Sequence, residues 1–161
     1  MRVMRDARAH VKRMLARFLL PYRANELIVD RRRCGLSGSV LIVDDEQLLA
    51  RILSSVLTEE GYRISVAGSA EQADSQVFGE TPFDLVLLDN RLPRESGIDL
   101  VKRLRERSVR SKVILMTAYE TPDVKTQVKR LEVDGYLRKP FDLTVLVNEI
   151  RDLIGPARRP G

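Results

Sequence analysis

The chain has 161 residues, 43% of them hydrophobic, which is enough for one ordinary domain and a short extension. Its single cysteine, Cys34, excludes an internal disulfide, and its single histidine, His10, excludes a zinc site built on several histidines. Its apolar runs are all shorter than the ~18 residues that a membrane span needs, so we expect a soluble, cytoplasmic protein.

The net charge of +5 is unevenly distributed along the sequence. Residues 1–38 carry ten Lys or Arg and three Asp or Glu, whereas residues 39–161 carry eighteen and twenty. We therefore expect a basic amino-terminal arm, a mildly acidic domain over residues 39–155 and a short tail over residues 156–161.

The arm has the spacing of an amphipathic helix followed by a flexible linker at residues 31–39. One helical stripe carries the apolar residues Val3, Ala7, Val11, Met14, Leu15 and Phe18, and basic residues fill the remainder. Such a helix suits a membrane surface, an acidic partner or nucleic acid. The alternative is an extension with no role of its own.

From residue 39 onward, strand-like apolar runs alternate with segments of helical spacing. The predicted strands are 40–44, 63–67, 84–89, 112–117 and 135–139. The predicted helices are 48–57, 70–78, 98–104, 122–132 and 143–154. Strands that are apolar from end to end indicate a parallel sheet covered on both faces. The predicted fold class is therefore α/β, with an open, doubly wound, five-stranded sheet.

Polar side chains follow or end four of the predicted strands. The first strand ends in Asp44-Asp45, the third in Asp89, the fourth in Thr117 and the fifth in Lys139. Because the carboxyl ends of parallel strands meet at one edge, we expect these side chains to share a site there. Three carboxylates form an oxygen-rich site that suits Mg²⁺.

Each of these residues also has an ordinary explanation when taken alone. Acids ahead of a helix often cap its first turn and complement its dipole, and a lysine at a strand end is often only solvated. We expect Glu46 only to cap the following helix, and Asp44 to combine capping with metal binding. Polar groups at the ends of four separate strands on one edge are improbable by chance, which favours a functional site.

Four stretches, LIVDDE, LLDNRLPRESG, LMTA and GYLRKPF, resemble the receiver domain of two-component response regulators. The intervals of 44 residues from Asp45 to Asp89, then 28 to Thr117 and 22 to Lys139, also suit that family. The resemblance covers about residues 39–155. It implies a flavodoxin-like strand order of 2-1-3-4-5 and a phosphoprotein that acts as a switch rather than as an enzyme.

The same resemblance implies a role for each residue at the strand ends. Asp89 becomes the phosphoacceptor, and Mg²⁺ is held by Asp44, Asp45, Asp89 and the main-chain carbonyl of Arg91. Lys139 contacts the phosphoryl group, and its bond to the following proline is expected to be cis.

On activation, by the same resemblance, Thr117 is drawn to the new phosphoryl oxygens and Tyr136 changes rotamer. Ordinary core packing is the alternative for Tyr136. Arg91 and Tyr119 lie where their side chains can shield the phosphoryl group from water.

The partners implied are a sensor histidine kinase or a histidine phosphotransfer protein. Output is expected through protein contacts of the face formed by 122–132, 135–139 and 143–154, with no direct nucleic acid binding by the receiver. The alternative is a receiver fragment of a longer DNA-binding response regulator.

Two other classes on the same architecture fit less well. A haloacid dehalogenase needs Asp-x-Asp on its nucleophile strand, and a flavin or nucleotide carrier needs a Gly-rich loop after the first strand; neither pattern is present. A degenerate receiver that never takes phosphate is disfavoured because all the core residues are there.

Overall fold

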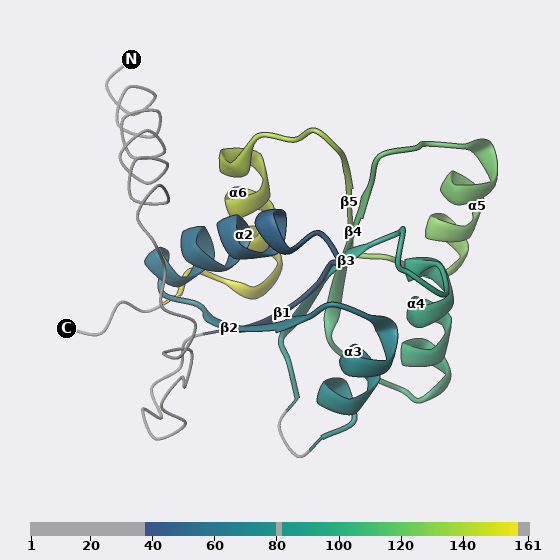
Figure 1. Cartoon of the computed structure of the whole chain (residues 1–161), viewed down its shortest axis with the longest axis horizontal. Coiled ribbons are helices and arrows are strands. Elements are labelled where there is room, and N and C mark those ends of the chain that lie inside the picture. The colour runs from purple at the N-terminus through teal and green to yellow at the C-terminus, as the bar shows by residue number, and fades with distance from the viewer. Residues whose placement is uncertain (1–37, 80–81, 158–161) are drawn as a thin grey trace. The chain divides into compact units, whose positions relative to one another are not determined.

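A computed structural model describes residues 38–79 and 82–157, and in this part of the chain five strands alternate with five helices (Figure 1). The strands are β1 (Ser39–Val43), β2 (Arg63–Ala67), β3 (Leu85–Asp89), β4 (Lys112–Thr117) and β5 (Gly135–Arg138). The helices are α2 (Gln47–Glu59), α3 (Ala70–Val77), α4 (Gly97–Glu106), α5 (Pro122–Arg130) and α6 (Leu143–Ile154). The predicted helix of the basic arm lies outside the described residues.

The strands form one parallel sheet in the order β2-β1-β3-β4-β5, which confirms the predicted fold class and strand order. Val43 pairs with Leu88, and Asp89 with Met116, so the carboxyl ends of the central strands are level with one another. The predicted boundaries differ by one or two residues. For example, α5 ends at Arg130 because Glu132, with a φ of 51°, turns the chain out of the helix.

Alternate residues of the central strands face two separate helical layers. In β1, Leu41 and Val43 belong to a buried cluster with residues of α3 and α4, while Val40 and Ile42 face the other side and are equally inaccessible. Figure 1 shows α3, α4 and α5 on one side of the sheet and α2 and α6 on the other. This double cover explains why the strands are apolar throughout.

Short connections at the carboxyl edge hold the strand ends in place. Ser69, Ser96, Thr121 and Asp142 each cap a helix, with a side-chain oxygen that accepts a main-chain N–H of the first turn. The helix α2 lacks such a side-chain cap. It is this exceptional helix that follows the acidic run after β1.

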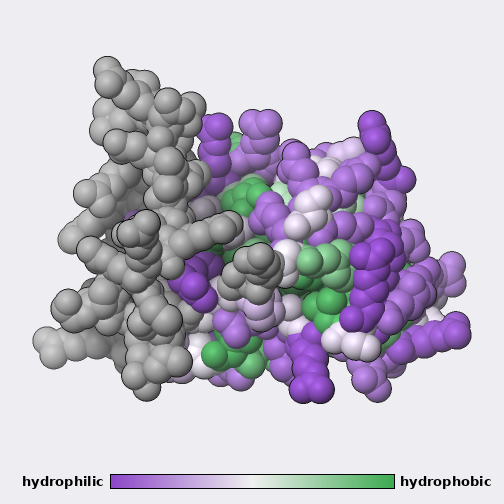
Figure 2. All heavy atoms as spheres, turned by 90° about the horizontal axis from the view of Figure 1, so that it is seen from below, coloured by the Kyte–Doolittle hydropathy of each residue, from purple (hydrophilic) through white to green (hydrophobic). Residues whose placement is uncertain are grey.

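The described part of the face in Figure 2 is mostly hydrophilic. Figure 2 shows one face, on which hydrophobic side chains form small areas between hydrophilic ones. The large exposed hydrophobic residues come from different elements and are Leu48, Val66, Phe78, Tyr119 and Val145. Among the described residues no helix is both long and apolar enough to cross a membrane.

Candidate functional site

The polar residues predicted from the strand ends lie together at the carboxyl edge of the sheet. Carboxylate oxygens of Asp44, Asp45 and Asp89 all lie within 4.8 Å of one another. Asp44 and Asp89 are buried and Asp45 is exposed, so the cluster extends from the protein interior to solvent. The prediction that these acids converge is confirmed.

Lys139 supplies a positive charge to this cluster from the end of β5. Its Nζ atom lies 2.9 Å from Oδ2 of Asp44 and 3.1 Å from Oδ2 of Asp89. Two like charges about 4 Å apart repel by about 4 kcal/mol at an effective dielectric near 20, so a shared cation offsets much of the cost of gathering the acids. The Lys139–Pro140 bond is cis, as the family resemblance implied.

The pKa values of Asp89 and Lys139 are both raised above their ordinary values, for different reasons. Burial raises the pKa of Asp89, the charge of Lys139 opposes that shift, and the neighbouring carboxylate of Asp44 adds to it. Burial alone would lower the pKa of Lys139, but its hydrogen bond and ion pair with Asp44 outweigh this and raise it. Lys139 therefore remains an ammonium ion in the site at neutral pH.

Main-chain N–H groups orient the two buried carboxylates. Oδ1 of Asp44 accepts the N–H of Glu46 at 2.8 Å, and Oδ1 of Asp89 accepts the N–H of Arg91 at 3.2 Å. The prediction that Glu46 caps α2 is wrong for its side chain, which makes no capping hydrogen bond although the residue occupies the N-cap position. Asp44 instead receives the N–H at the start of the helix, and the longer Glu side chain is a poor capping group.

Solvent reaches the cluster through an open depression of about 420 Å³. Its lining residues are Asp45, Glu46, Asp89, Arg91, Leu92, Pro93, Ala118 and Lys139. Asp89 is only 7% exposed, but it lines this depression, which is open to solvent. At the rim, the guanidinium carbon of Arg91 lies 5.8 Å from the centre of the Tyr119 ring, which is cation–π distance.

Thr117 and Tyr136, the two predicted switch residues, do not line the depression. The Thr117 hydroxyl donates to the carbonyl of Tyr119 at 2.9 Å and accepts the N–H of Tyr119 at 3.2 Å, so it is bonded within its own turn. Tyr136 is half-buried against the core cluster, and its hydroxyl oxygen is buried without a hydrogen-bond partner. Burial raises the pKa of Tyr136, the charge of Glu120 raises it further, and Arg138 opposes both.

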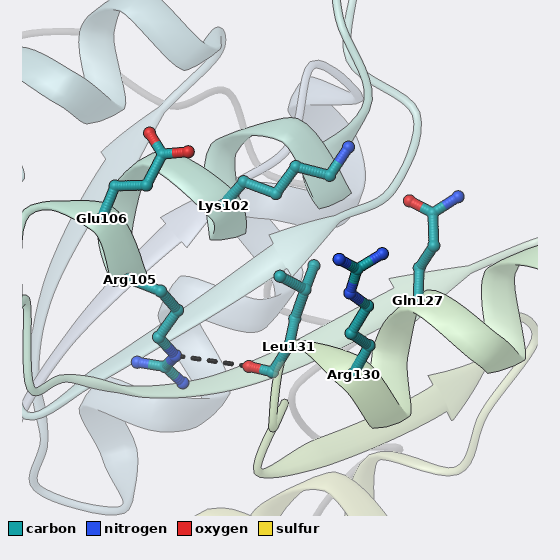
Figure 3. A pocket seen from close by; sticks show the side chains of 6 residues that line it. All are labelled: Lys102, Arg105, Glu106, Gln127, Arg130 and Leu131. Carbon is teal, nitrogen blue, oxygen red and sulfur yellow. Dashed lines mark hydrogen bonds between the residues drawn. The ribbon is translucent and has the colours of Figure 1, made fainter.

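A second and larger groove in the described part of the chain lies away from this site. It has a volume of about 540 Å³, lies between α4 and α5, and shares no lining residue with the acidic depression. Figure 3 shows its wall, where Arg105 points to the carbonyl of Leu131 while Lys102, Glu106, Gln127 and Arg130 surround the opening. The Arg105 guanidinium is already bonded to several main-chain carbonyls and to Asp134, so the groove lacks the converging reactive groups of the depression.

Two networks of charged side chains were not predicted from the sequence. Arg103 of α4 binds Asp74 and Glu95, and Asp134 binds Arg105 and Lys112. Charged residues of these kinds occur on most solvated helices, and the partners are up to 29 positions apart in the chain. The sequence holds no local signal that would pair them.

Comparison with known proteins supports the geometry. The sequence matches the response regulator receiver domain family over residues 40–151. It is 37% identical over 119 residues to the sporulation initiation phosphotransferase F of Bacillus subtilis, covering 74% of this chain and 92% of that protein. It is also 37% identical over 115 residues to the transcriptional regulatory protein PmrA of Pectobacterium parmentieri, covering 71% of this chain but only 51% of PmrA. The chain likewise spans about half the length of several other curated relatives.

The solved structures most relevant to the site are receivers as well. The response regulator protein TrrA from Thermotoga maritima, in complex with Mg²⁺ and BeF, superimposes with a TM-score of 0.64 and 32% identity, covering 72% of this chain and 98% of that one. A CheY-like receiver domain protein from Methanospirillum hungatei has a TM-score of 0.69 and 26% identity, covering 72% and 92%.

Proposed function

The chain belongs to the response regulator receiver domain family, and from that premise we propose that Asp89 accepts a phosphoryl group from a sensor histidine kinase or a histidine phosphotransfer protein. As a receiver domain, the protein is a phosphorylation switch of two-component signalling, a phosphoacceptor rather than an enzyme that turns over a substrate. The observation that carries the proposal for Asp89 is its place in the depression, beside Asp45 and within 3.1 Å of Lys139.

The chemistry of the transfer asks mainly for position and charge. An oxygen of the Asp89 carboxylate forms a bond to phosphorus while the bond from phosphorus to the donor's imidazole nitrogen, or to the oxygen of an acyl phosphate, breaks. The electron pair of that bond leaves with the donor. A carboxylate needs no general base, and Lys139 supports the step by holding a positive charge next to the incoming anion.

The donor set fits a magnesium ion. The carboxylate oxygens of Asp44, Asp45 and Asp89 are hard donors close enough to share one cation, and with the main-chain carbonyl of Arg91 they would hold it. The chemistry supplied by Mg²⁺ when bound is neutralisation of charge on the carboxylates and on the phosphoryl oxygens. The solved relative that contains Mg²⁺ and BeF supports this choice of ion.

We further propose that Thr117 and Tyr136 transmit the change. Contact between the Thr117 hydroxyl and a phosphorylated Asp89 requires the hydroxyl to leave its turn with Tyr119, which moves the loop after β4. Tyr136 has no hydrogen bond at its hydroxyl to break, so a change of rotamer costs it no such bond. The output surface would then be the face of α5, β5 and α6, read by a protein partner.

A second candidate is the receiver part of a longer, DNA-binding response regulator. It is favoured by the relatives named as transcriptional regulators, of which the chain spans about half. In either case the division into an arm at 1–38, a receiver at 39–155 and a tail at 156–161 stays a prediction. The binding of the arm to a membrane or to an acidic partner also stays a prediction.

Intact-mass measurement after incubation with acetyl phosphate and Mg²⁺ tests the proposal. We expect a gain of one phosphoryl group, about 80 Da, that EDTA prevents and that is absent from Asp89→Ala. Asp84→Ala is a matched control, since that aspartate lies at the opposite end of β3 and bonds to Ser39. An adduct that persists in Asp89→Ala would show that another residue is the acceptor.

A further inference from the structure

The loop between β3 and α4, residues 90–96, is folded tightly next to the proposed phosphoacceptor. The N–H of Gly97 donates to the carbonyl of Asn90 at 2.9 Å, and Arg91 pairs with Ser96 in an isolated antiparallel bridge. A side chain at position 97 would collide with the carbonyl oxygen of Asp89, which explains the glycine. The direction of the Arg91 carbonyl therefore depends on how this loop is held.

Arg103, nearly two turns into α4, reaches back to this loop. Its two terminal nitrogens bind both carboxylate oxygens of Glu95, one of them at 2.9 Å, in the forked geometry that gives arginine its strongest pairs. The side chains are only 29% and 24% exposed, so water screens the pair less than it would at the surface. The hydrogen bonds with Glu95 are the main reason why the pKa of Arg103 is raised.

The same guanidinium also binds α3. A terminal nitrogen of Arg103 lies 3.1 Å from Oδ2 of Asp74, while Nε of Arg103 and Oδ1 of Asp74 are buried without partners. One arginine thus joins three segments: the helix α3, the loop that contains Arg91, and the helix α4 that follows it. Removal of the arginine would take away the cation that Glu95 and Asp74 share.

An ion pair between the same loop and the helix α3 provides an internal comparison. Arg94 lies 3.3 Å from Glu71, but the two side chains are 83% and 60% exposed. Exposed pairs of this kind contribute little to structure. Arg94 and Arg103 carry the same charge near the same loop, and they differ in burial and in the number of bonds.

We propose that Arg103 is a positioning residue for the magnesium site, which holds the loop so that the Arg91 carbonyl and the Asp89 carboxylate converge on one ion. The inference rests on the proposed function, because it assumes that the acid cluster binds Mg²⁺. Arg103 itself binds neither the ion nor the phosphoryl group. Its effect is exerted through Glu95 and the main chain of the loop.

The test is the Mg²⁺ dissociation constant of the full chain, followed by amide NMR shifts in a titration, with no phosphorylation involved. Arg103→Met should weaken Mg²⁺ binding about tenfold, the lower end of the effect of losing a residue that orients metal ligands. Loss of a nearby positive charge alone would strengthen binding of a cation, so the expected change has the opposite sign to a general charge effect. Arg94→Met removes the same charge and should leave the constant unchanged or slightly tighter.

Two further variants separate position from charge and from folding. Arg103→Lys keeps the charge without the fork and should stay weakened, whereas full recovery by lysine would overturn the proposal. Glu95→Gln should weaken binding at least as much as Arg103→Met, because it removes the partner of the arginine and also a nearby negative charge. The double variant has the net charge of the wild type and should still be as weak as Arg103→Met, whereas wild-type affinity in the double variant would point to a charge effect. Glu95→Gln decides the matter if Arg103→Met does not fold. If the wild type and Glu95→Gln bind Mg²⁺ equally well, the role of Arg103 is refuted and the proposed function still stands. If the wild type binds no Mg²⁺, the proposed function is refuted.

Discussion

The Nζ atom of Lys139 lies 2.9 Å from Oδ2 of Asp44, a carboxylate whose side chain has no exposed surface. The same nitrogen also serves Asp89 at 3.1 Å, so one cation offsets two buried anions from other strands. Removal of Lys139 leaves those two anions without a cation, and the nearby carboxylate of Asp45 adds further negative charge.

We therefore expect Lys139→Met to lower the free energy of unfolding in EDTA by about 3 kcal/mol, near the lower end of the cost of breaking a buried pair. Mg²⁺ should restore more stability in this variant than in the wild type, since the ion no longer competes with an ammonium for Asp44 and Asp89. Urea unfolding with and without Mg²⁺ measures both effects. Lys125→Met, which removes a more exposed partner of Glu120, is the control, and unchanged stability of Lys139→Met in EDTA would contradict the argument.

The contact between Arg91 and Tyr119 predicts the lifetime of the phosphorylated state. The Tyr119 side chain is 67% exposed, so the ring is held at the rim mainly by the cation–π contact rather than by packing. In Tyr119→Ala the rim is open to water, and we expect the adduct to be lost several times faster than in the wild type. Tyr119→Phe keeps the ring face that attracts the guanidinium and should behave like the wild type. Decay of the mass adduct after removal of acetyl phosphate gives these rates, and equal rates for Ala and Phe would argue against shielding by the ring.

Asp134 should make stability depend on acid pH. Burial alone would raise its pKa, but hydrogen bonds from Lys112 and from the N–H of Val113, with the charges of Lys112 and Arg105, outweigh burial and lower it. A carboxyl with a lowered pKa in the folded state stabilises the fold above its unfolded pKa of about 3.9, and this stabilisation is lost as pH falls through the folded value.

At pH 7 we expect Asp134→Asn to be less stable than the wild type by about 1.5–3 kcal/mol, the usual range for a hydrogen bond to a charged group. The difference should remain constant down to about pH 5 and should shrink as the wild-type carboxyl is protonated below about pH 4. Urea titrations at pH 7, 5 and 3 follow it. A difference that persists unchanged at pH 3 would mean that the amide disrupts packing rather than removing a charge.

The fold and the cluster of acids could be predicted from the sequence, but the contacts that hold the acids in place could not. The proximity of Asp44, Asp89 and Lys139 was predictable because parallel strands place their carboxyl ends at one edge of the sheet. The pairing of Arg103 with Glu95 and Asp74 depends on the rotation of α4 about its axis and on the path of the loop. The periodicity of hydrophobic residues in the sequence predicts neither of these. The incorrect prediction for Glu46 has a similar cause, since the direction of its side chain depends on the turn after β1, in which Asp44 accepts the N–H of Glu46.

The buried hydroxyl of Tyr136 separates a switch from ordinary core packing. Because that hydroxyl has no hydrogen-bond partner, its removal leaves no other group unpaired. We expect Tyr136→Phe to be as stable as the wild type or more stable by up to about 1 kcal/mol, and to be phosphorylated equally well. Tyr136→Ala should lose about 3 kcal/mol through the cavity that it leaves. A loss of stability in Tyr136→Phe would reveal a hydrogen bond of the hydroxyl and would weaken the case for a free rotamer change.

An anionic membrane is one of the partners that the sequence of the basic arm suits, beside an acidic protein or nucleic acid, and binding to it should need both the charge and the apolar stripe of the arm. Ten Lys or Arg against three acids favour an anionic surface by about 1 kcal/mol for each basic residue near it, an attraction that salt weakens. We expect the full chain to sediment with vesicles of phosphatidylserine and phosphatidylcholine at low salt and to be released at high salt. Leu15→Glu combined with Phe18→Glu should abolish sedimentation, whereas Val145→Glu, which changes an exposed apolar residue of α6, should not.

Because the arm joins the domain at the amino end of β1 and the acids lie at the carboxyl ends of the strands, labelling of Asp89 by acetyl phosphate should be the same in all these variants. Sedimentation that survives the Leu15 and Phe18 changes would reduce the arm to a purely electrostatic contact, and none in any variant would leave an acidic protein as the better partner.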